Sequence, residues 1–256
     1  MNLREISSKI KNINNILQVF TAMKMMSSSK YQVFLKNLKK IETLQENLPF
    51  FPEEKKTPSQ NDAVYLVYAS DKGLCGNFNT KLKQKMKELQ EDAKIILLGK
   101  KLLPFLRERK IKPLMVFQDV DHYNLYDFAC FLSEQVYELP LSSFNLLYIK
   151  YFNGMKQEAV VENLFELGKM NAKNLGESPS EGDFKKVSKE LFVTAKIYHA
   201  LMQSKTCEHF FRMQAMENSI NNSKEMKESL NLIYNKQRQS KITQEILEII
   251  NGSLLT

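Results

Sequence analysis

The stretch LREISSKIKNINNILQVFTAMKMMSSSKYQVFLKNLKKIETLQENL, from Leu3 to Leu48, decides the fold. A seam of alternating three- and four-residue steps runs along it, and only Lys24, Ser27 and Gln45 on this seam are polar. An apolar repeat of about 3.5 residues held over roughly six heptads predicts a long helix that needs a partner helix along its length. The seam consists of Leu3, Ile6, Ile10, Ile13, Leu17, Phe20, Lys24, Ser27, Tyr31, Phe34, Leu38, Ile41, Gln45 and Leu48.

The partner helix is expected at the other end of the chain, from about Lys205 to Leu255. This is the other segment long enough for the role, and Ile242, Ile246, Ile249 and Ser253 continue an apolar seam in it. A helix of this kind rises about 1.5 Å per residue, so the first segment would extend over roughly 70 Å. Such a rod spans distance rather than building an active site. The sequence therefore predicts a two-helix coiled coil made from the two ends of the chain.

Between these ends, short β-forming runs alternate with helical segments. The run AVYLVYA is apolar on both faces, which is typical of a strand covered by helices on each side. The alternation predicts an α/β domain with a mainly parallel, Rossmann-like sheet. The expected strands are Ala63 to Ala69, Lys94 to Leu98, Pro113 to Gln118, Phe144 to Phe152 and Val160 to Leu167; the expected helices are Phe78 to Glu91, Lys100 to Arg109 and Tyr126 to Glu138.

The chain is accordingly expected to divide into three parts. Residues 1–57 would form the N-terminal helix and a connector, residues 58–184 the central α/β domain, and residues 185–256 the C-terminal helix. The longest purely apolar aliphatic run inside the chain is Ile95 to Leu98. We therefore expect neither a membrane span nor an export signal.

Charge and cysteine content narrow the class of protein. The net charge is +8, and from Met1 to Leu48 eight Lys and Arg residues face three Glu residues. This excess indicates either a solvated basic face or contact with an acidic partner, protein or nucleic acid. The cysteines, Cys75, Cys130 and Cys207, are widely spaced and odd in number. This argues against a disulfide framework or a zinc site.

The turn SDKGLCGN, Ser70 to Asn77, is the clearest candidate for a ligand site. It follows a predicted strand and precedes a helix, where backbone amides can approach a phosphate. However, Gly73 and Gly76 make only a G-x-x-G spacing, without the third glycine of a dinucleotide site or the G-K-[ST] of a nucleoside triphosphate site. A tight turn capped by Asp71 or Asn77, with no cofactor, is the favoured interpretation. A nucleotide-binding enzyme and a coiled-coil nucleic-acid-binding protein remain as alternatives.

The remaining candidates for chemistry are isolated. His122, His199 and His209 lack the spacing of a metal site or a catalytic triad. Cys75 lies near a predicted helix start, which can activate a thiol, although a lone thiol of this kind is more often inert. No catalytic, cofactor-binding or metal-binding residue is therefore assigned.

Side chains off the seam of the long helices suggest contacts with a partner. Met23, Met25 and Met26 should face away from the partner helix, towards the middle domain or a surrounding protein. Methionine suits surfaces that slide or repack. In the last helix, a guanidinium and a carboxylate can form forked hydrogen bonds to a partner, or can simply be solvated. The off-seam residues concerned there are Arg238, Gln239, Thr243 and Glu245.

Three blocks of sequence resemble the gamma subunit family of the F-type ATP synthase. They are TAMKMMSSSK, Thr21 to Lys30; SDKGLCGNFN, Ser70 to Asn79; and FRMQAMENSINNSKEMKESLNLIYNKQRQSKITQEILEIINGS, Phe211 to Ser253. The second block matches that family's turn with Lys72 and Asn77 substituted. Order and spacing agree along the whole chain, so the resemblance covers nearly all 256 residues.

The resemblance implies a rotor shaft without a nucleotide site of its own. In that family the two terminal helices form an antiparallel coiled coil inside a ring of three alpha and three beta subunits. The α/β domain rests on the membrane c-ring beside epsilon, and one copy of the subunit is present per complex. Rotation driven by protons then forces the beta subunits through their catalytic states. No nucleic acid is bound, and no segment inserts directly into the membrane.

The resemblance also assigns contact residues and a location. Met23 and Arg212 would lie where the shaft meets a lever region of the beta subunit, and the C-terminal helix would catch a beta subunit higher up. The complex would sit on the cytoplasmic face of a bacterial inner membrane or, alternatively, on the matrix side of a mitochondrial one. The residues at the upper contact would be Arg238, Gln239, Thr243, Glu245 and Glu248.

The seam generates a direct test. Replacing Ile10 or Leu17 with Asp would place an unpaired carboxylate inside the coiled coil, at a cost of several kcal/mol. Replacing Lys9 or Lys11, which lie off the seam, should be tolerated. Thermal melting and co-purification with partner subunits measure both effects, and equal tolerance at the two kinds of position would show that the heptad assignment is wrong.

Overall fold

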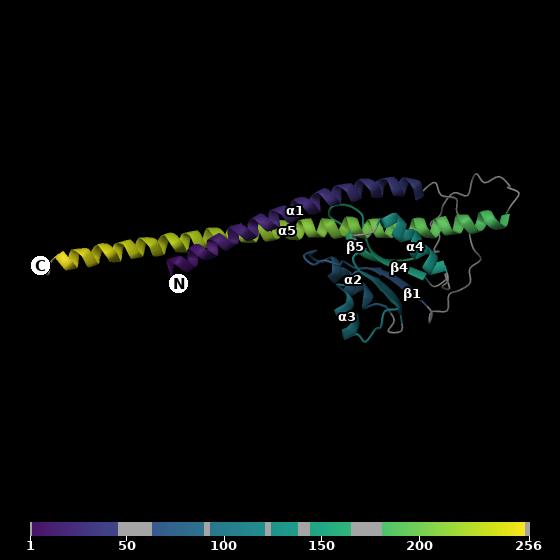
Figure 1. Cartoon of the computed structure of the whole chain (residues 1–256), viewed down its shortest axis with the longest axis horizontal. Helices are drawn as coiled ribbons and strands as arrows, with labels where there is room; N and C mark the ends of the chain where they lie inside the picture. Colours follow the sequence, from purple (N-terminus) through teal and green to yellow (C-terminus); the bar gives the residue numbers. More distant parts are fainter. Residues whose placement is uncertain are drawn as a thin grey trace. The chain divides into compact units, whose positions relative to one another are not determined.

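The structure is a computed structural model, and it describes residues 2–45, 63–89, 93–120, 124–137, 144–164 and 181–253. The chain forms two compact units. Residues 1–27 and 213–256 make the first unit, and residues 28–212 make the second. The two units follow other boundaries than the three parts expected from the sequence. The expected division at residues 57 and 184 stays a prediction. Figure 1 shows the helices and strands of each unit.

The first unit is a pair of helices. Helix α1 (Leu3–Gln45) contributes its N-terminal part and helix α5 (Glu181–Ser253) its C-terminal part. Lys24 Nζ lies 2.7 Å from Glu217 Oε1 across the pair. Every seam residue from Leu3 to Ile41 is buried or half-buried, so the predicted heptad seam is confirmed.

Helix α5 begins at Glu181, four residues before the C-terminal helical part expected from residue 185 and well before the coiled-coil segment expected from about Lys205. In the second unit, every residue from Ala200 to His209 is buried. A helix covered on several sides shows no single apolar stripe, so no periodic seam marks this stretch in the sequence. This stretch also contains several buried polar side chains. They are Gln203, Ser204, Lys205, Thr206, Glu208 and His209.

The second unit is built on a five-stranded sheet in the order β3-β2-β1-β4-β5. Neighbouring strands from β3 to β4 are parallel, whereas β5 runs antiparallel to β4. The prediction of a mainly parallel sheet is confirmed, and the last strand begins three residues earlier than expected. The strands are β1 (Val64–Tyr68), β2 (Lys94–Leu98), β3 (Met115–Phe117), β4 (Phe144–Tyr151) and β5 (Gln157–Asn163).

Helices cover both faces of this sheet, as the apolar runs in its central strands require. Helices α2 (Phe78–Met86) and α3 (Leu103–Glu108) lie on one face, and α4 (Leu125–Tyr137) and α5 lie on the other (Figure 1). Thr194 on α5 donates a 2.8 Å hydrogen bond to Ser133 on α4. Within the described residues, no helix combines the length and apolar character needed to cross a bilayer.

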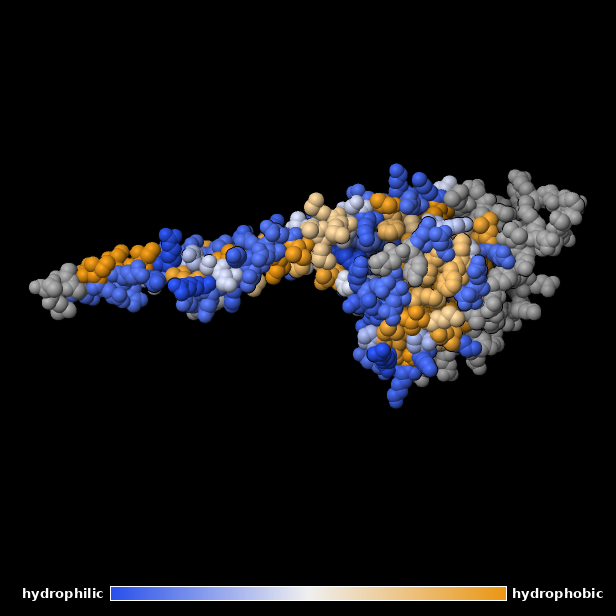
Figure 2. All heavy atoms as spheres, viewed as in Figure 1, coloured by the Kyte–Doolittle hydropathy of each residue, from blue (hydrophilic) through white to orange (hydrophobic). Residues whose placement is uncertain are grey.

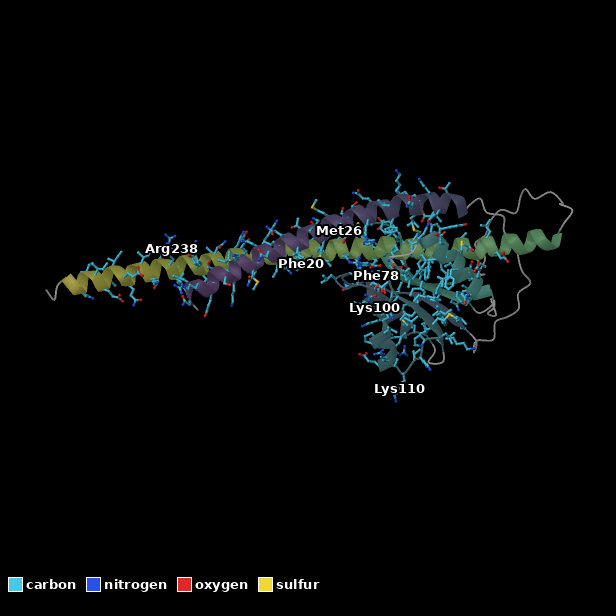
Figure 3. The ribbon with its side chains drawn as sticks, in the orientation of Figure 1. Phe20, Met26, Phe78, Lys100, Lys110 and Arg238 are labelled. Atoms are coloured by element: carbon cyan, nitrogen blue, oxygen red, sulfur yellow. The ribbon has the colours of Figure 1, made fainter. Side chains whose placement is uncertain are left out.

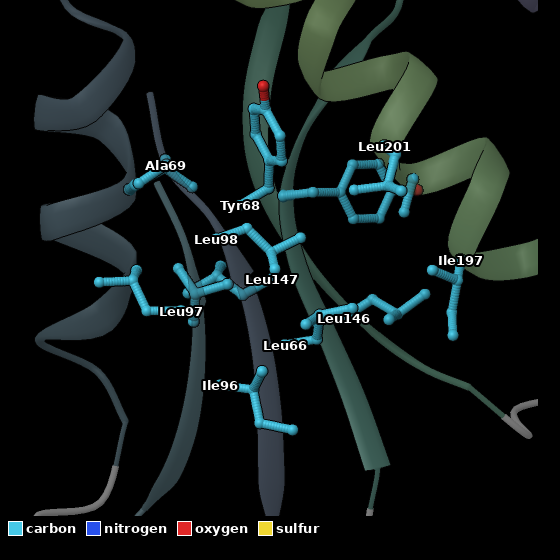
Figure 4. Close-up of a cluster of buried hydrophobic side chains, with 14 of the residues drawn as sticks. Leu66, Tyr68, Ala69, Ile96, Leu97, Leu98, Leu146, Leu147, Ile197 and Leu201 are labelled. Carbon is cyan, nitrogen blue, oxygen red and sulfur yellow. The ribbon is translucent and has the colours of Figure 1, made fainter. Parts of the chain in front are cut away.

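The hydrophobic core of the second unit includes side chains of α2 and α3 as well as of α5, and one part of it lies between the sheet and α5. Figure 4 shows Leu66 of β1 and Leu146 of β4 on the side of the sheet that faces Ile197 and Leu201 of α5. All four side chains are at most 4% exposed. Full burial of an aliphatic side chain of this size contributes about 1.5–3 kcal/mol, so this contact is a major source of stability for the unit.

A single carboxylate ties three strand ends together. Asp71, 7% exposed just after β1, accepts hydrogen bonds from the backbone N–H groups of Lys100 (3.2 Å) and Val120 (3.1 Å). These residues follow β2 and β3. Of the two residues expected to cap the next helix, Asn77 occupies the N-cap position of α2, but no side-chain hydrogen bond is made there. Asp71 is instead used to hold the carboxyl edge of the sheet.

The position directly after β2 requires a glycine, Gly99. Its φ is +85°, and a Cβ atom there would lie 2.2 Å from the carbonyl oxygen of Ala69. Gly99→Ala should therefore lower the free energy of unfolding by at least about 2 kcal/mol, since both strain and a backbone clash are introduced. Thermal or urea unfolding measures the change.

Gly73→Ala is the matched control. A Cβ atom at Gly73 would have its nearest contact 3.8 Å away, on the flexible Lys101 side chain. This variant should unfold within about 0.5 kcal/mol of the parent, as is usual for substitutions at unstrained surface positions. Equal losses in the two glycine variants would contradict the assignment of strain to Gly99.

Candidate functional site: the exposed faces of the helix pair and the buried charges of α5

The first unit exposes apolar side chains on α1. Ile16 and Val19 are 44% and 56% exposed, and Met25 and Met26 are 68% and 63% exposed (Figure 3 labels Met26). The expectation that Met25 and Met26 face away from the partner helix is confirmed, whereas Met23 is half-buried. An exposed row of large apolar side chains on a helix marks a contact surface.

The C-terminal part of α5 carries a second apolar stripe. All residues from Arg238 to Asn251 are exposed. Ile242, Ile246 and Ile249 are 43%, 51% and 71% exposed, so the prediction that they continue the buried seam is wrong. They do not share the three-four spacing of the half-buried positions before them, and the stripe therefore turns to another side of the helix. Figure 2 shows an orange band beside a blue one on this part of α5.

Polar groups accompany this stripe, and they include the contact residues predicted from the sequence. The Thr243 hydroxyl donates to the Gln239 carbonyl oxygen at 3.0 Å, and Glu245 Oε1 lies 3.6 Å from Lys241 Nζ. Within the part of the chain that the structure describes, no hydrogen bond or ion pair engages the Arg238 guanidinium (Figure 3). The five residues gathered on these last turns are Arg238, Gln239, Thr243, Glu245 and Glu248.

Arg212, the other arginine expected to contact a partner, is buried, unlike the exposed residues at the end of α5. It belongs to the second unit, is 8% exposed, and donates from Nη2 to Glu208 Oε1 at 2.6 Å. Its guanidinium is thus engaged within its own chain. The contacts of Arg212 and of the five exposed residues with a beta subunit stay predictions.

The sequence did not single out the cluster around Glu208. Its carboxylate is 2% exposed and accepts from Arg212 and from the Tyr68 hydroxyl, the latter at 2.9 Å. Lys205 Nζ lies 3.6 Å from Glu208 Oε2 and 5.4 Å from the centre of the Tyr68 ring. Burial alone would raise the pKa of Glu208, but Lys205 and Arg212 reverse the effect and lower it. The spacing of Lys205, Glu208 and Arg212, at steps of three and four, was the available signal.

Two histidines of α5 are buried beside α1. The His209 ring stacks on Phe34, with centroids 5.4 Å apart, and the His199 ring lies 3.9 Å from Glu42 Oε1. Burial lowers the pKa of each histidine to about 4. Both rings are therefore neutral at pH 7.

The Ser70 to Asn77 turn is held by its own polar groups. Asn79 Nδ2 donates to Ser70 Oγ at 2.7 Å and lies 3.2 Å from Cys75 Sγ. Cys75 is 4% exposed. Among the described residues, no group of three or more His, Cys, Asp or Glu side chains is placed to hold a metal ion.

Comparisons with known proteins agree with this arrangement. The sequence profile described as ATP synthase matches residues 2–254. A gamma chain from Mycoplasmopsis synoviae is 30% identical over 100% of this chain and 99% of its own length, and one from Campylobacter lari is 29% identical over 98% of both. A chain of the Euglena gracilis mitochondrial ATP synthase (OSCP/F1/c-ring) has a similar fold, with a TM-score of 0.75, 18% identity, and coverage of 98% of this chain and 93% of that one.

The chain therefore belongs to the ATP synthase family. Within that family, its relatives are gamma chains, which it matches over nearly their whole length.

The buried histidines predict how stability depends on pH. Each has a pKa of about 4 in the folded chain, against 6.5 when unfolded. The unfolded state binds more protons between these values, so stability is complete above pH 6.5 and falls as the pH falls towards 4. We expect a loss of about 2 kcal/mol per histidine between pH 7 and pH 5. Urea unfolding at several pH values measures it.

His199→Gln and His209→Gln keep a polar side chain that does not titrate. Each variant should lose less stability between pH 7 and pH 5 than the parent, and the double variant least of all. A double variant with an undiminished pH dependence would show that the histidines are not its source.

Proposed function

We propose that this chain is the central-stalk rotor subunit of an F-type ATP synthase. It would couple proton-driven rotation of the membrane c-ring to the conformational cycle of the catalytic beta subunits. The observation that carries the proposal is the last part of α5, where an apolar stripe and the Arg238 guanidinium are exposed together. An amphipathic helix end of this kind suits a surrounding protein surface that covers the stripe.

The helix pair would work inside a ring of alpha and beta subunits. In this proposal Ile16, Val19 and the two exposed methionines on α1 face that ring. Methionine side chains repack easily, and this suits a surface that meets a series of partners in turn. Met23 would contribute to the same contact from its half-buried position.

The α/β unit would serve as the foot of the rotor. We propose that it rests on the c-ring and beside epsilon, with one copy of the chain in each complex. The chain would thus be peripheral to the membrane, on the cytoplasmic face of a bacterial inner membrane. It would bind no nucleotide and catalyse no step, and the nucleotide sites would lie on its partners. The G-x-x-G spacing of Gly73 and Gly76, which lacks the signature of a nucleotide site, supports this division of labour.

Assembly provides the primary test. The chain should co-purify with alpha and beta subunits as a complex that hydrolyses ATP. In vesicles that contain the membrane sector, omission of the chain should abolish ATP-driven proton pumping. A complex that assembles and pumps equally well without it would overturn the proposal.

The upper contact can be tested separately. Arg238→Ala with Gln239→Leu should leave the stability of the isolated chain unchanged, because both side chains are exposed. Each hydrogen bond to a charged group contributes roughly 1.5–3 kcal/mol, so the loss of this contact should change turnover or coupling by about tenfold. ATP hydrolysis and proton pumping in reconstituted vesicles measure it.

The control is Asn222→Leu with Lys224→Ala, which makes the same two kinds of change at exposed positions of α5. The control should hydrolyse ATP and pump at the parental rates. Parental rates in the Arg238 and Gln239 variant as well would remove these residues from the contact.

A further inference from the structure

The most buried part of α5 carries its most polar sequence. From Ala200 to His209 every residue is buried, and Lys205 and Glu208 are only 3% and 2% exposed. Chains normally keep such groups at the surface, because taking a charge out of water costs several kcal/mol. Hydrophobic packing of the second unit therefore does not explain why these charged side chains are buried.

The polar side chains of α5 form directed bonds to two adjacent strands of the sheet. Glu208 accepts from the Tyr68 hydroxyl on β1 at 2.9 Å. Gln203 Oε1 accepts from the Tyr151 backbone N–H on β4 at 2.7 Å. The two acceptors are five residues apart on α5, about 7.5 Å along its axis. The helix is thus fixed to the sheet at two separate points.

The partners of Glu208 hold its carboxylate in one orientation. Arg212 Nη2 lies 2.6 Å from Oε1, and Lys205 Nζ lies 3.6 Å from Oε2. Lys205 also lies over the Tyr68 ring. Both oxygens of the carboxylate are therefore engaged, one by α5 itself and the other also by β1.

Stability alone does not explain this arrangement. Replacing a buried ion cluster with apolar side chains is often neutral or even stabilising. The best-attested role of buried polar groups is to fix the register of packed elements. Aliphatic contacts such as those of Ile197 and Leu201 are not directional. Hydrogen bonds weaken steeply when their angles change, so they resist rotation and sliding of the helix.

We propose that the Glu208 cluster and its bond to Tyr68 lock the rotation and axial register of α5 on the sheet, so that torque passes from the α/β unit to the helix without slippage. This role rests on the proposed rotor function and deepens it. Tyr68 and Glu208 are positioning residues in this scheme. The lock is needed when the rotor works against a load, and it is dispensable when the rotor turns freely.

Tyr68→Phe is the test with the least disturbance. It removes only the hydroxyl that joins β1 to α5, and it leaves Glu208 paired with Arg212 and Lys205. Tyr65→Phe is the control, three residues earlier on the same strand and, by the alternation of side chains along a strand, on the opposite face. Both variants should assemble with alpha and beta subunits as the parent does.

The readout is the ratio of protons pumped to ATP hydrolysed in reconstituted vesicles, followed while the proton gradient builds. Without a gradient, we expect Tyr68→Phe to hydrolyse ATP within twofold of the parental rate. As the gradient grows, the ratio of protons pumped to ATP hydrolysed should decrease in both proteins, and the decrease should be at least twofold larger in Tyr68→Phe than in the parent. Tyr65→Phe should follow the parent throughout.

Two results would overturn the lock. The first is a parental pumping ratio for Tyr68→Phe at every gradient. The second is a proportional loss of hydrolysis and pumping without a gradient, which a merely structural defect would produce. Failure of the proposed function itself would appear differently, because the unmodified chain would then not assemble with alpha and beta subunits or support pumping.

Discussion

The second unit depends on the burial of α5 between Ala200 and His209. One side of this stretch meets the sheet through the Glu208 cluster, and another meets α1 through the stack of His209 on Phe34. A helix enclosed in this way pairs most of its polar side chains within the protein, because each unpaired one costs about 1–3 kcal/mol. Among the described residues of this stretch, only the Ser204 hydroxyl is buried without a hydrogen-bond partner. The ion cluster around Glu208 and the two bonds to the strands pair the polar side chains on the side of α5 that meets the sheet.

The sequence predicts those parts of the structure in which apolar residues recur with a single period, that of a helix or that of a strand. The α1 seam is such a part, because a single partner covers one stripe of the helix from Leu3 to Ile41. The strands are another, because apolar runs bounded by turns have few alternatives. In helix α5, predictions from the apolar pattern fail in two places. Its stretch from Ala200 to His209 is covered on more than one side, and its last turns expose Ile242 and Ile249.

The candidate site was predictable to a similar extent. Arg238 and its neighbours were found from their positions off the seam and from the resemblance, and the structure places them together on exposed turns of one helix. The Glu208 cluster was not found, because a Lys, a Glu and an Arg at helical spacing are usually a solvated face. Only the fold shows that Tyr68 approaches the same carboxylate. Asp71 was noticed as a cap, yet its partners lie 29 and 49 residues away, beyond any local rule.

The pairing of α1 with α5 also determines the order in which the chain can fold. Lys24 and Glu217 are 193 residues apart in sequence, so the seam of α1 emerges from the ribosome long before its partner exists. Contacts of such long range slow folding and leave apolar surface uncovered in the interval. The α/β unit holds most of the intervening residues, and its completion brings the start of α5 back to α1. The seam of α1 therefore stays uncovered until α5 has been synthesised, and a chain released before that point would present an unpaired apolar stripe to chaperones or to other chains.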